Sequence, residues 1–497
     1  MDPSHDLTEG SIFKNLIKLS WPGALGRLFE NLYDVVDMFW IGTLGGVLAT
    51  QAQAGILFFN VANSFMQMLN SIFGPGSITV ISRFWGARDY EKAAWASEQT
   101  ILYKFLAGLA GTIISLFTLP YLVRFAGART DLVVGCTYST FDLALLYGWF
   151  IVAALPLIFV YYTINTIFRC CSDAESSMFV IATSSLVNIV IDPFFIHGFG
   201  PIPKMGIVGA ALATVLAYIY AVVIGLYMLC NGLKFKISRF TFLALPYRKG
   251  DYYKYLIRIP YWKFHFEKGG IKIVFGRLFK PDLQILINYL RIGFTPTITQ
   301  FVGSSSQIIF MNLISNFGQS VVTAFGIGGK VAGLVNLPLL GLQQATSALV
   351  GQNLGAKKPE RSEKTGWYSV LIGVCLGFVM VVVGYFFAPQ IFWVFNKDPA
   401  VIAVGKSVFT LSMIGNMINA AQWMLWAVFE GSGYTMWPSI LGQVNNWLFN
   451  ILLVYLAVKV FDQGYVWIFY IGIFSAIMST AVNTFLVRKG SWKKAKV

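Results

Sequence analysis

The chain has 497 residues, of which 56% are hydrophobic and only 12% are charged, and its mean hydropathy is +0.66. A soluble domain averages about 25% charged residues, so this composition excludes an ordinary soluble protein and predicts one that is embedded in a membrane. The formal net charge of +15 raises the alternative of a nucleic-acid-binding protein. That alternative is disfavoured, because the positive charge flanks apolar segments along the whole chain.

Long apolar segments follow one another almost without interruption. A helix needs roughly 20 residues to cross a bilayer core about 30 Å thick, and twelve segments meet this requirement. The predicted spans are 12–41, 50–80, 98–125, 135–168, 177–197, 206–232, 284–316, 320–350, 367–396, 402–428, 436–460 and 464–487. Several are longer than the core requires, which predicts tilted or kinked helices. The sequence therefore predicts an all-α membrane protein with twelve transmembrane helices.

Basic residues gather between the sixth and seventh spans and after the last one. Residues 233–282 hold twelve Lys or Arg against three acids, and residues 488–497 add five more basic residues. Positively charged loops stay on the cytoplasmic side of a membrane. With an even number of spans, both termini and this segment are predicted to be cytoplasmic, in the inner (plasma) membrane of the cell.

The basic segment divides the chain into an N-lobe, 1–232, a cytoplasmic insertion, 233–282, and a C-lobe, 283–497. From Arg258 to Glu267 aromatic and cationic residues alternate with a period near two, which is typical of a strand or a short hairpin. One interpretation is a regulatory or lipid-headgroup-binding element. The other, which we favour, is a solvated connector whose basic side chains lie against anionic lipid.

An internal repeat supports the division into two lobes. Residues 84–92 and 353–361 follow the second span of their respective halves, and each combines a Gly-Ala pair with the mixed charges of a helix start. Proline recurs early in both halves, as Pro22 and Pro296. Repeated halves that face each other around a central site are a common plan of secondary transporters.

Inside the first span, four ionisable residues follow one another at intervals of three, four and three positions: Arg27, Glu30, Asp34 and Asp37. Such intervals return to the same face of a helix, so these residues predict one polar stripe. Charged groups at bilayer depth are costly and normally face a bundle interior or a water-filled cavity. The stripe is therefore a candidate functional site, although a structural ion pair is an equally good interpretation of Arg27 with Glu30.

Other charged residues in the spans are assigned simpler roles. Lys104 and Asp142 lie near predicted span ends and are expected to reach the membrane surface. Glu430 lies at a helix end beside Gly431 and Gly433, where a loop-facing role is expected.

Catalytic and metal-binding patterns are weak in this sequence. The five cysteines show no paired CxxC spacing, and the three histidines are scattered. Neither a metal centre nor a disulfide framework is expected. No phosphate-binding loop is present either, so transport driven by nucleotide hydrolysis within this chain is not expected.

Five stretches resemble the multidrug and toxic compound extrusion (MATE) transporters, and in particular their DinF-like prokaryotic branch. This family belongs to the multidrug/oligosaccharidyl-lipid/polysaccharide exporter superfamily. The stretches occur in the same order and cover both halves: Leu7–Ile12 with Leu19–Pro22, Leu32–Asp37, Asn188–Pro193, Gly209–Thr214 and Val350–Ala356. The resemblance implies twelve helices in two pseudo-symmetric six-helix lobes.

The resemblance also implies an N-lobe cation site formed by Asp37, Asn188, Asp192 and Thr214. Asn188 and Asp192 are four residues apart and share a helix face, where an amide and a carboxylate can bind Na⁺ or tune a proton acceptor. The family often has Asn where this chain has Asp34, so Asp34 adds an acid to the site. No cofactor is expected besides the coupling ion, H⁺ or Na⁺.

The predicted function is that of a secondary active exporter, not of an enzyme. It would exchange an inward-moving cation for outward-moving amphipathic, cationic organic molecules by alternating access. A lipid-linked oligosaccharide flippase of the same superfamily is the main alternative, and it would need several cations in its cavity; a membrane-embedded transferase is a weaker one. We expect small-molecule substrates, contact with membrane lipids, no nucleic acid, and a monomer.

Overall fold

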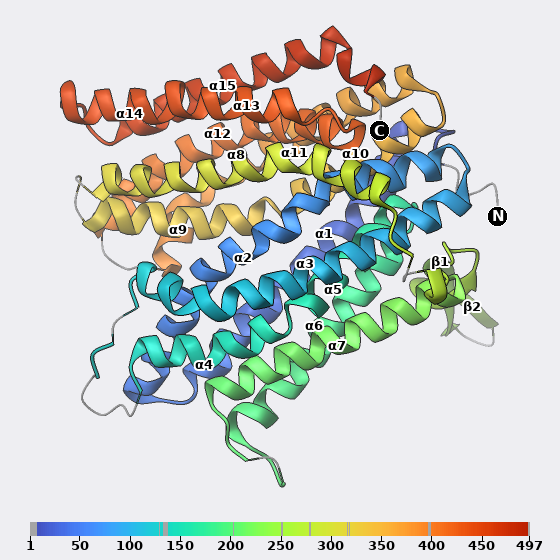
Figure 1. Cartoon of the computed structure of the whole chain (residues 1–497), viewed down its shortest axis with the longest axis horizontal. Coiled ribbons are helices and arrows are strands. Elements are labelled where there is room, and N and C mark those ends of the chain that lie inside the picture. The colour runs from blue at the N-terminus through green and yellow to red at the C-terminus, as the bar shows by residue number, and fades with distance from the viewer. Residues whose placement is uncertain are drawn as a thin grey trace.

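The computed structural model describes residues 7–128, 130–132, 138–201, 203–249, 252–277, 280–315, 317, 319–395 and 399–495. Within these ranges the chain is almost entirely helical, and two strands that follow the N-lobe helices in the chain lie at one end of the molecule (Figure 1). The residues that run along the helices are mainly apolar, so each helix satisfies its own backbone hydrogen bonds where no water is available.

The described part of the N-lobe contains seven helices. They are α1 (Ile12–Gly42), α2 (Gly46–Gly86), α3 (Tyr90–Phe125), α4 (Thr140–Ala153), α5 (Leu155–Cys170), α6 (Ala174–His197) and α7 (Ile207–Asn231). The short helices α4 and α5 meet at Ala154 with a bend of 58°. Pro156 near the start of α5 cannot donate a backbone hydrogen bond, which accounts for the break. The predicted fourth span is therefore one broken helix.

The C-lobe repeats this plan with more interruptions. Its elements are α8 (Leu283–Ser315), α9 (Gln319–Val335), α10 (Leu337–Gly355), α11 (Pro359–Phe395), α12 (Pro399–Ser432), α13 (Met436–Asn445), η3 (Asn446–Leu452), α14 (Leu453–Tyr455), η4 (Leu456–Val460) and α15 (Val466–Lys489). Pro338 starts α10 just after Asn336, so the predicted span 320–350 is also broken. The elements η3 and η4 are π-helical turns within one rod that runs from α13. Short 3₁₀ turns, η2 (Phe275–Arg277) and η5 (Ser491–Lys494), complete the chain.

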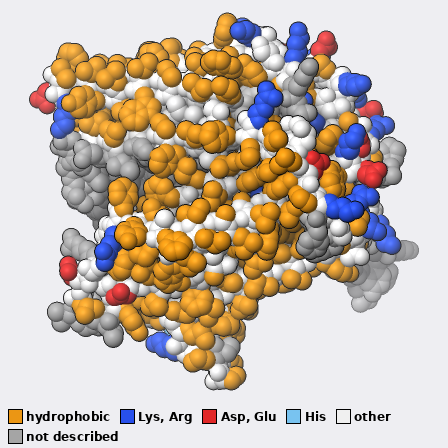
Figure 2. Space-filling view, viewed as in Figure 1, with side chains coloured by type: hydrophobic (Ala, Val, Ile, Leu, Met, Phe, Trp, Pro, Cys, Tyr) orange, Lys and Arg blue, Asp and Glu red, His pale blue; other side chains and the backbone are white. Residues whose placement is uncertain are grey.

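In chain order these elements form twelve rods, which confirms the predicted all-α fold of two six-helix lobes. Seven of the described helices, or eight with the bent pair, are long and apolar enough to cross a membrane. The rods that fail this test include α1, α8 and α12, which carry charged or amide side chains inside the bundle. Large apolar side chains are exposed along many rods, and Figure 2 shows them covering the middle of the visible face, with Lys and Arg gathered at its ends. Such a broad apolar surface belongs against lipid tails.

The two lobes meet mainly along α1, α2, α8 and α10. Helix α1 contacts α10, and α2 contacts both α8 and α10. Figure 1 shows the lobes lying side by side, with both chain ends and the hairpin at the same end of the molecule, which we call the terminal end.

At the terminal end the lobes are in direct backbone contact. A Cβ atom on Gly86 would lie 1.9 Å from the Gln352 carbonyl oxygen, and one on Gly355 would lie 1.9 Å from the Arg83 carbonyl oxygen. The Arg83 guanidinium also donates to the Ser432 carbonyl oxygen at 2.7 Å and to the Ala495 carbonyl oxygen at 2.8 Å. Glycine is required here because only a residue without a Cβ lets the two backbones approach so closely.

Strands β1 (Leu233–Lys249) and β2 (Tyr252–Lys268) form an antiparallel hairpin, which confirms the period-two prediction for residues 258–267. The base of the hairpin lies on the start of α6. The Phe235 backbone N–H donates to Ser176 Oγ at 2.8 Å, and the Phe235 and Phe179 rings stack 4.4 Å apart. The hairpin is therefore anchored to the N-lobe through α6.

Replacing Gly355 by alanine is expected to open the terminal end. The new methyl group would overlap the backbone of Arg83, so α2 and α10 must separate, at a cost of about 1–3 kcal/mol. We expect a lower melting temperature in detergent and faster maleimide labelling of the buried Cys170 and Cys171.

A matched control is Gly472→Ala, because a Cβ on Gly472 would meet nothing within 4 Å. This change is expected to leave stability equal or slightly higher, since alanine has the better helix propensity. Equal melting temperatures for the two variants would contradict the close-contact interpretation.

The N-cap of α6 predicts a pH effect on stability. The Asp173 carboxylate accepts from the Ser176 backbone N–H at 3.2 Å, and burial raises the pKa of Asp173 from 3.8 to about 6. A carboxyl group with a raised pKa in the folded state costs stability above that pKa and costs nothing below its unfolded pKa. Asp173→Asn, which keeps a capping side chain, is therefore expected to stabilise the protein by up to about 3 kcal/mol at pH 7–8 and hardly at all near pH 4.

Asp89→Asn at the N-cap of α3 is the control, measured by thermal unfolding at both pH values. Hydrogen bonds from Lys92 lower the pKa of Asp89, so its charged form is the favoured one. No stabilisation at pH 7–8 is expected for this variant. A gain for Asp173→Asn that is the same at both pH values would contradict the prediction.

Candidate functional site

Helix α1 carries Asp37 into the interior of the N-lobe. The Asp37 side chain is buried, and the Thr214 hydroxyl of α7 donates to Asp37 Oδ2 at 3.4 Å. Thr214 is buried as well. The contact joins the first and last helices of the lobe at one point, although they are 177 residues apart in the chain.

Helix α6 contributes the amide and the second carboxylate. Asn188 and Asp192 are 1% and 0% exposed, and Asn188 Nδ2 donates to Asp192 Oδ1 at 3.4 Å. Their spacing of four places both on one face of α6, as the sequence predicts. The carboxyl groups of Asp37 and Asp192 lie within hydrogen-bonding reach of one another when one of them carries a proton.

Three oxygen atoms of this group have no hydrogen-bond partner in the described part of the chain: Asp37 Oδ1, Asn188 Oδ1 and Asp192 Oδ2. Buried oxygens of this kind are costly unless something satisfies them. A proton held between the two carboxylates would satisfy part of the set. Alternatively, Na⁺, which takes carboxylate, amide and hydroxyl oxygens, would be bound by these oxygens. The residues present therefore fit either coupling ion.

A small cavity of about 20 Å³ adjoins this group and is lined in part by Asn188, Thr214, Tyr33 and Tyr218. It has room for about one water molecule. The hydroxyl groups of Tyr33 and Tyr218 lie 3.3 Å apart beside it. These tyrosines were not predicted, and aromatic residues are so frequent in this chain that sequence alone gave no signal for them.

The other members of the predicted stripe have different surroundings. Asp34 is exposed, and among the described residues no hydrogen bond joins it to Asp37, Asn188, Asp192 or Thr214. Its inclusion in the cation site stays a prediction.

Arg27 and Glu30 form the anticipated ion pair, with Arg27 Nη1 and Glu30 Oε2 2.7 Å apart. Tyr161 of α5 also donates to Glu30 Oε1 at 3.1 Å. The pair therefore connects α1 to α5. Arg27 has a second role as well, because it lines the large central cavity.

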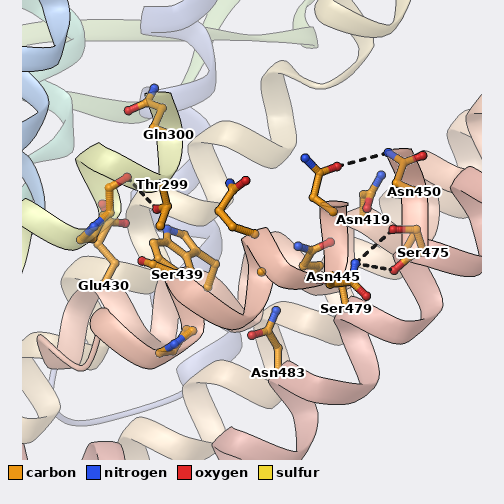
Figure 3. Close-up of a pocket in the computed structure, with 18 of the residues that line it drawn as sticks. Thr299, Gln300, Asn419, Glu430, Ser439, Asn445, Asn450, Ser475, Ser479 and Asn483 are labelled. Atoms are coloured by element: carbon orange, nitrogen blue, oxygen red, sulfur yellow. Dashed lines mark hydrogen bonds between the residues drawn. The ribbon is translucent and has the colours of Figure 1, made fainter. Parts of the chain in front are cut away.

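The central cavity lies between the lobes and has a volume of about 1160 Å³. It exceeds the range of about 300–1000 Å³ that is usual for small-molecule sites. Eleven amide side chains line it, most of them from the C-lobe: Gln67, Asn70, Gln300, Asn416, Asn419, Gln422, Gln443, Asn445, Asn446, Asn450 and Asn483. Figure 3 shows several of these amides, with the hydroxyl groups of Thr299, Ser439, Ser475 and Ser479, around the cavity.

Two charged residues of the cavity correct the sequence analysis. Lys104 was expected to reach the membrane surface, but it is 2% exposed and lines the cavity. Glu430 was expected to face a loop, but it also lines the cavity (Figure 3). Helices continue past the apolar segments at both places, so the end of a hydropathy run is not the end of the bundle. Asp142 instead forms a capping box with Ser139 at the start of α4.

The amides of the C-lobe were missed altogether, although a signal was present. Asn416 and Asn419 are three residues apart in an apolar span, and Asn446 and Asn450 are four apart, which is the spacing that singled out the stripe in the first span. In the structure Asn446 and Asn450 lie in the π-helical turn η3, a type of distortion that is frequent at functional sites.

Two facing six-helix lobes with a polar cavity between them, together with a buried carboxylate pair, define a membrane transporter. Comparison with known proteins agrees, because the family model described as MatE matches residues 22–194 and 296–456. The chain therefore belongs to the MatE family. Asp37, Asn188 and Asp192 lie within the matched residues, whereas Thr214 lies outside them.

Curated relatives match most of the chain at low identity. The "Probable multidrug resistance protein YoeA" of Bacillus subtilis (strain 168) is 23% identical over 88% of this chain and 85% of its own length. The "Multidrug export protein MepA" of Staphylococcus aureus (strain N315) is 22% identical over 87% of this chain and 85% of its own length.

Solved structures share the fold over the whole chain. A MOP superfamily transporter from Pyrococcus furiosus Vc1 (DSM3638), described as having a binding pocket of reverse polarity, matches with a TM-score of 0.81 at 22% identity, covering 100% of both chains. The outward-facing conformation of a multidrug resistance MATE family transporter matches with a TM-score of 0.79 at 23% identity, also over 100% of both chains. At these identities the structures establish the fold alone.

The ion pair in α1 predicts a measurable coupling energy. Glu30→Gln would leave the half-buried Arg27 without its acid, and Arg27→Gln would do the converse. A double-mutant cycle of unfolding in detergent is expected to give a coupling of about 1 kcal/mol or more. The comparable i,i+3 pair of Asp89 with Lys92 is more exposed and is expected to give less than about 0.5 kcal/mol. Equal coupling for both pairs would show that burial adds nothing.

Proposed function

We propose that this chain is a secondary active exporter in which an inward-moving cation, Na⁺ or H⁺, binds between Asp37 and Asp192 and drives an organic solute outward. The main observation in support is that three buried oxygens, one each on Asp37, Asn188 and Asp192, have no hydrogen-bond partner in the described part of the chain. Two adjacent carboxylates excluded from water are poorly stable when both are charged, so the uptake of one positive ion is strongly favoured.

Helix α1 connects the ion to the solute pathway. Asp37 lies ten residues after Arg27, so the cation site and the cavity wall are about 15 Å apart along one helix. The same helix packs against α10 of the other lobe, where a Cβ on Gly341 would lie 2.5 Å from the Ser20 carbonyl oxygen. A change in α1 at the ion site therefore acts on both the cavity and the lobe interface.

Pro22 provides the place where α1 can bend. It lies inside the helix and removes one backbone hydrogen bond of the first turns. It is also close in sequence to Ser20 and Ala24, which contact Gly341 of α10. In the proposed cycle, ion binding bends α1 near Pro22, loosens its contact with α10 and lets the lobes exchange access between the two sides of the membrane.

The terminal end is the cytoplasmic side in this proposal, because the basic hairpin and the basic C-terminal tail lie there. The lobes are closed at this end by the glycine contacts and the Arg83 hydrogen bonds. The described conformation is then the outward-facing one, in the cell membrane, with both termini in the cytoplasm. Names of the curated relatives support multidrug export, and the family resemblance suggests amphipathic cations as solutes.

Removing either carboxylate charge is expected to abolish coupling. Asp37→Asn and Asp192→Asn should each lower gradient-driven efflux in proteoliposomes by at least about tenfold, because a neutral amide cannot exchange a proton or balance Na⁺. Imposing a Na⁺ gradient and a pH gradient separately identifies the ion.

Glu360→Gln serves as the control, since Glu360 is an exposed acid of α11 far in sequence from the site, and full efflux is expected. Wild-type efflux rates in both aspartate variants, at matched reconstitution, would reject the proposed function.

A further inference from the structure

The balance of charges in the central cavity disfavours a cationic solute. Among the described residues, three cationic side chains line it, Arg27, Lys104 and Arg169, against one acid, Glu430. Each added positive charge in a cavity of low dielectric repels a cation and attracts an anion. The cavity is therefore electrostatically suited to an anion, although Arg27 is already paired with Glu30.

Lys104 and Arg169 are the cavity cations that form no ion pair with an acid in the described part of the chain. Lys104 is 2% exposed, and within the described ranges it has neither a hydrogen bond nor an ion pair. Among the described residues, the side-chain hydrogen bonds of Arg169 go to hydroxyl groups, Thr166 Oγ1 at 3.3 Å and Ser177 Oγ at 3.4 Å. No described acid lies within 4 Å of Arg169, although the charges of Glu30 and Glu430 act on it from farther away. A buried ammonium group without a counter-charge costs several kcal/mol, which an anionic group of the solute would offset.

The rest of the wall fits a solute with hydroxyl groups and an apolar part. The amides of α12, α13 and α15 can both donate and accept hydrogen bonds, as sugar hydroxyls require (Figure 3). At the opposite end from the terminal closure, the rings of Phe310, Phe325 and Phe469 form an apolar cluster, with centroid separations of 5.8 Å and 6.3 Å.

We propose that the central cavity takes an amphipathic organic anion whose phosphate or carboxylate group binds between Lys104 and Arg169 and whose hydroxyl-bearing part lies on the amides of the C-lobe. This inference rests on the proposed function, in that the cavity is the solute site of the exporter. It replaces the cationic solute of the family resemblance with an anionic one. The same chemistry occurs in a free sugar phosphate and in the headgroup of a diphosphate-linked sugar lipid.

Equilibrium binding to the purified full chain in detergent tests the proposal without any ion gradient. The probes are glucose 1-phosphate, N-acetylglucosamine joined through a diphosphate to a farnesyl chain, and ethidium as the cation. At least one anionic probe is expected to bind more tightly than ethidium. Binding of both glucose 1-phosphate and the farnesyl compound indicates that the site takes a free anion. Binding of the farnesyl compound alone indicates that it takes a lipid headgroup.

Substitutions of the charged cavity residues then test where the anionic group binds. Lys104→Gln and Arg169→Gln are each expected to raise the Kd of the anionic probe about tenfold, Lys104→Arg to restore it, and Glu430→Gln to lower it. Lys406→Gln is the control, because Lys406 is an exposed cation of α12 outside the cavity, and its Kd should be unchanged.

Two results would overturn the inference: neither anionic probe binds, or Lys104→Gln and Arg169→Gln leave its Kd unchanged while the proteins stay monodisperse. The proposed function is tested separately, and it is rejected if Asp37→Asn and Asp192→Asn both keep wild-type rates of gradient-driven efflux. The Asp37→Asn variant is expected to keep anion binding even where it loses gradient-driven transport.

Discussion

The interior of the N-lobe depends on one energetically unfavourable contact. Two carboxylates, one from α1 and one from α6, lie close together where water is excluded. Asp37 and Asp192 are buried, they lie within reach of each other, and three oxygens around them lack partners in the described structure. Such a group is poorly satisfied by the protein alone, and in the proposed cycle a cation bound there would bias the position of the helices that carry it. The helix that carries Asp37 also lines the central cavity and contacts the opposite lobe.

The two lobes contribute different kinds of polar side chain. The N-lobe holds the buried acids and supplies all three cations of the cavity wall, whereas the C-lobe supplies most of the amides, the aromatic cluster and Glu430. A pseudo-symmetric fold therefore contains an asymmetric site. Under the proposed function, ion and solute would have separate binding places, and coupling would pass through helix movement and not through competition for the same acid.

The terminal end is closed by backbone contacts that depend on glycine. Gly86 and Gly355 allow α2 and α10 to touch through their backbones, and Arg83 adds hydrogen bonds across the lobes. These contacts involve small residues and few ion pairs, so they can form and separate without leaving isolated charges in lipid. A closure of this kind is suited to reversible opening during a transport cycle.

Hydropathy and helical periodicity determined the twelve rods, the hairpin in the basic insertion, and the shared faces of Arg27 with Glu30 and of Asn188 with Asp192, because each of these depends on residues close in the chain. The meeting of Asp37 with Thr214, the burial of Lys104, the position of Glu430 in the cavity and the gathering of C-lobe amides depend on helices that are distant in the chain, and only the tertiary structure decided them. Sequence alone could identify a charged residue inside an apolar span but not the surface it faces. That surface is fixed by how the rods pack around one another, and the cations that this packing brings to the cavity are the basis for proposing an anionic solute.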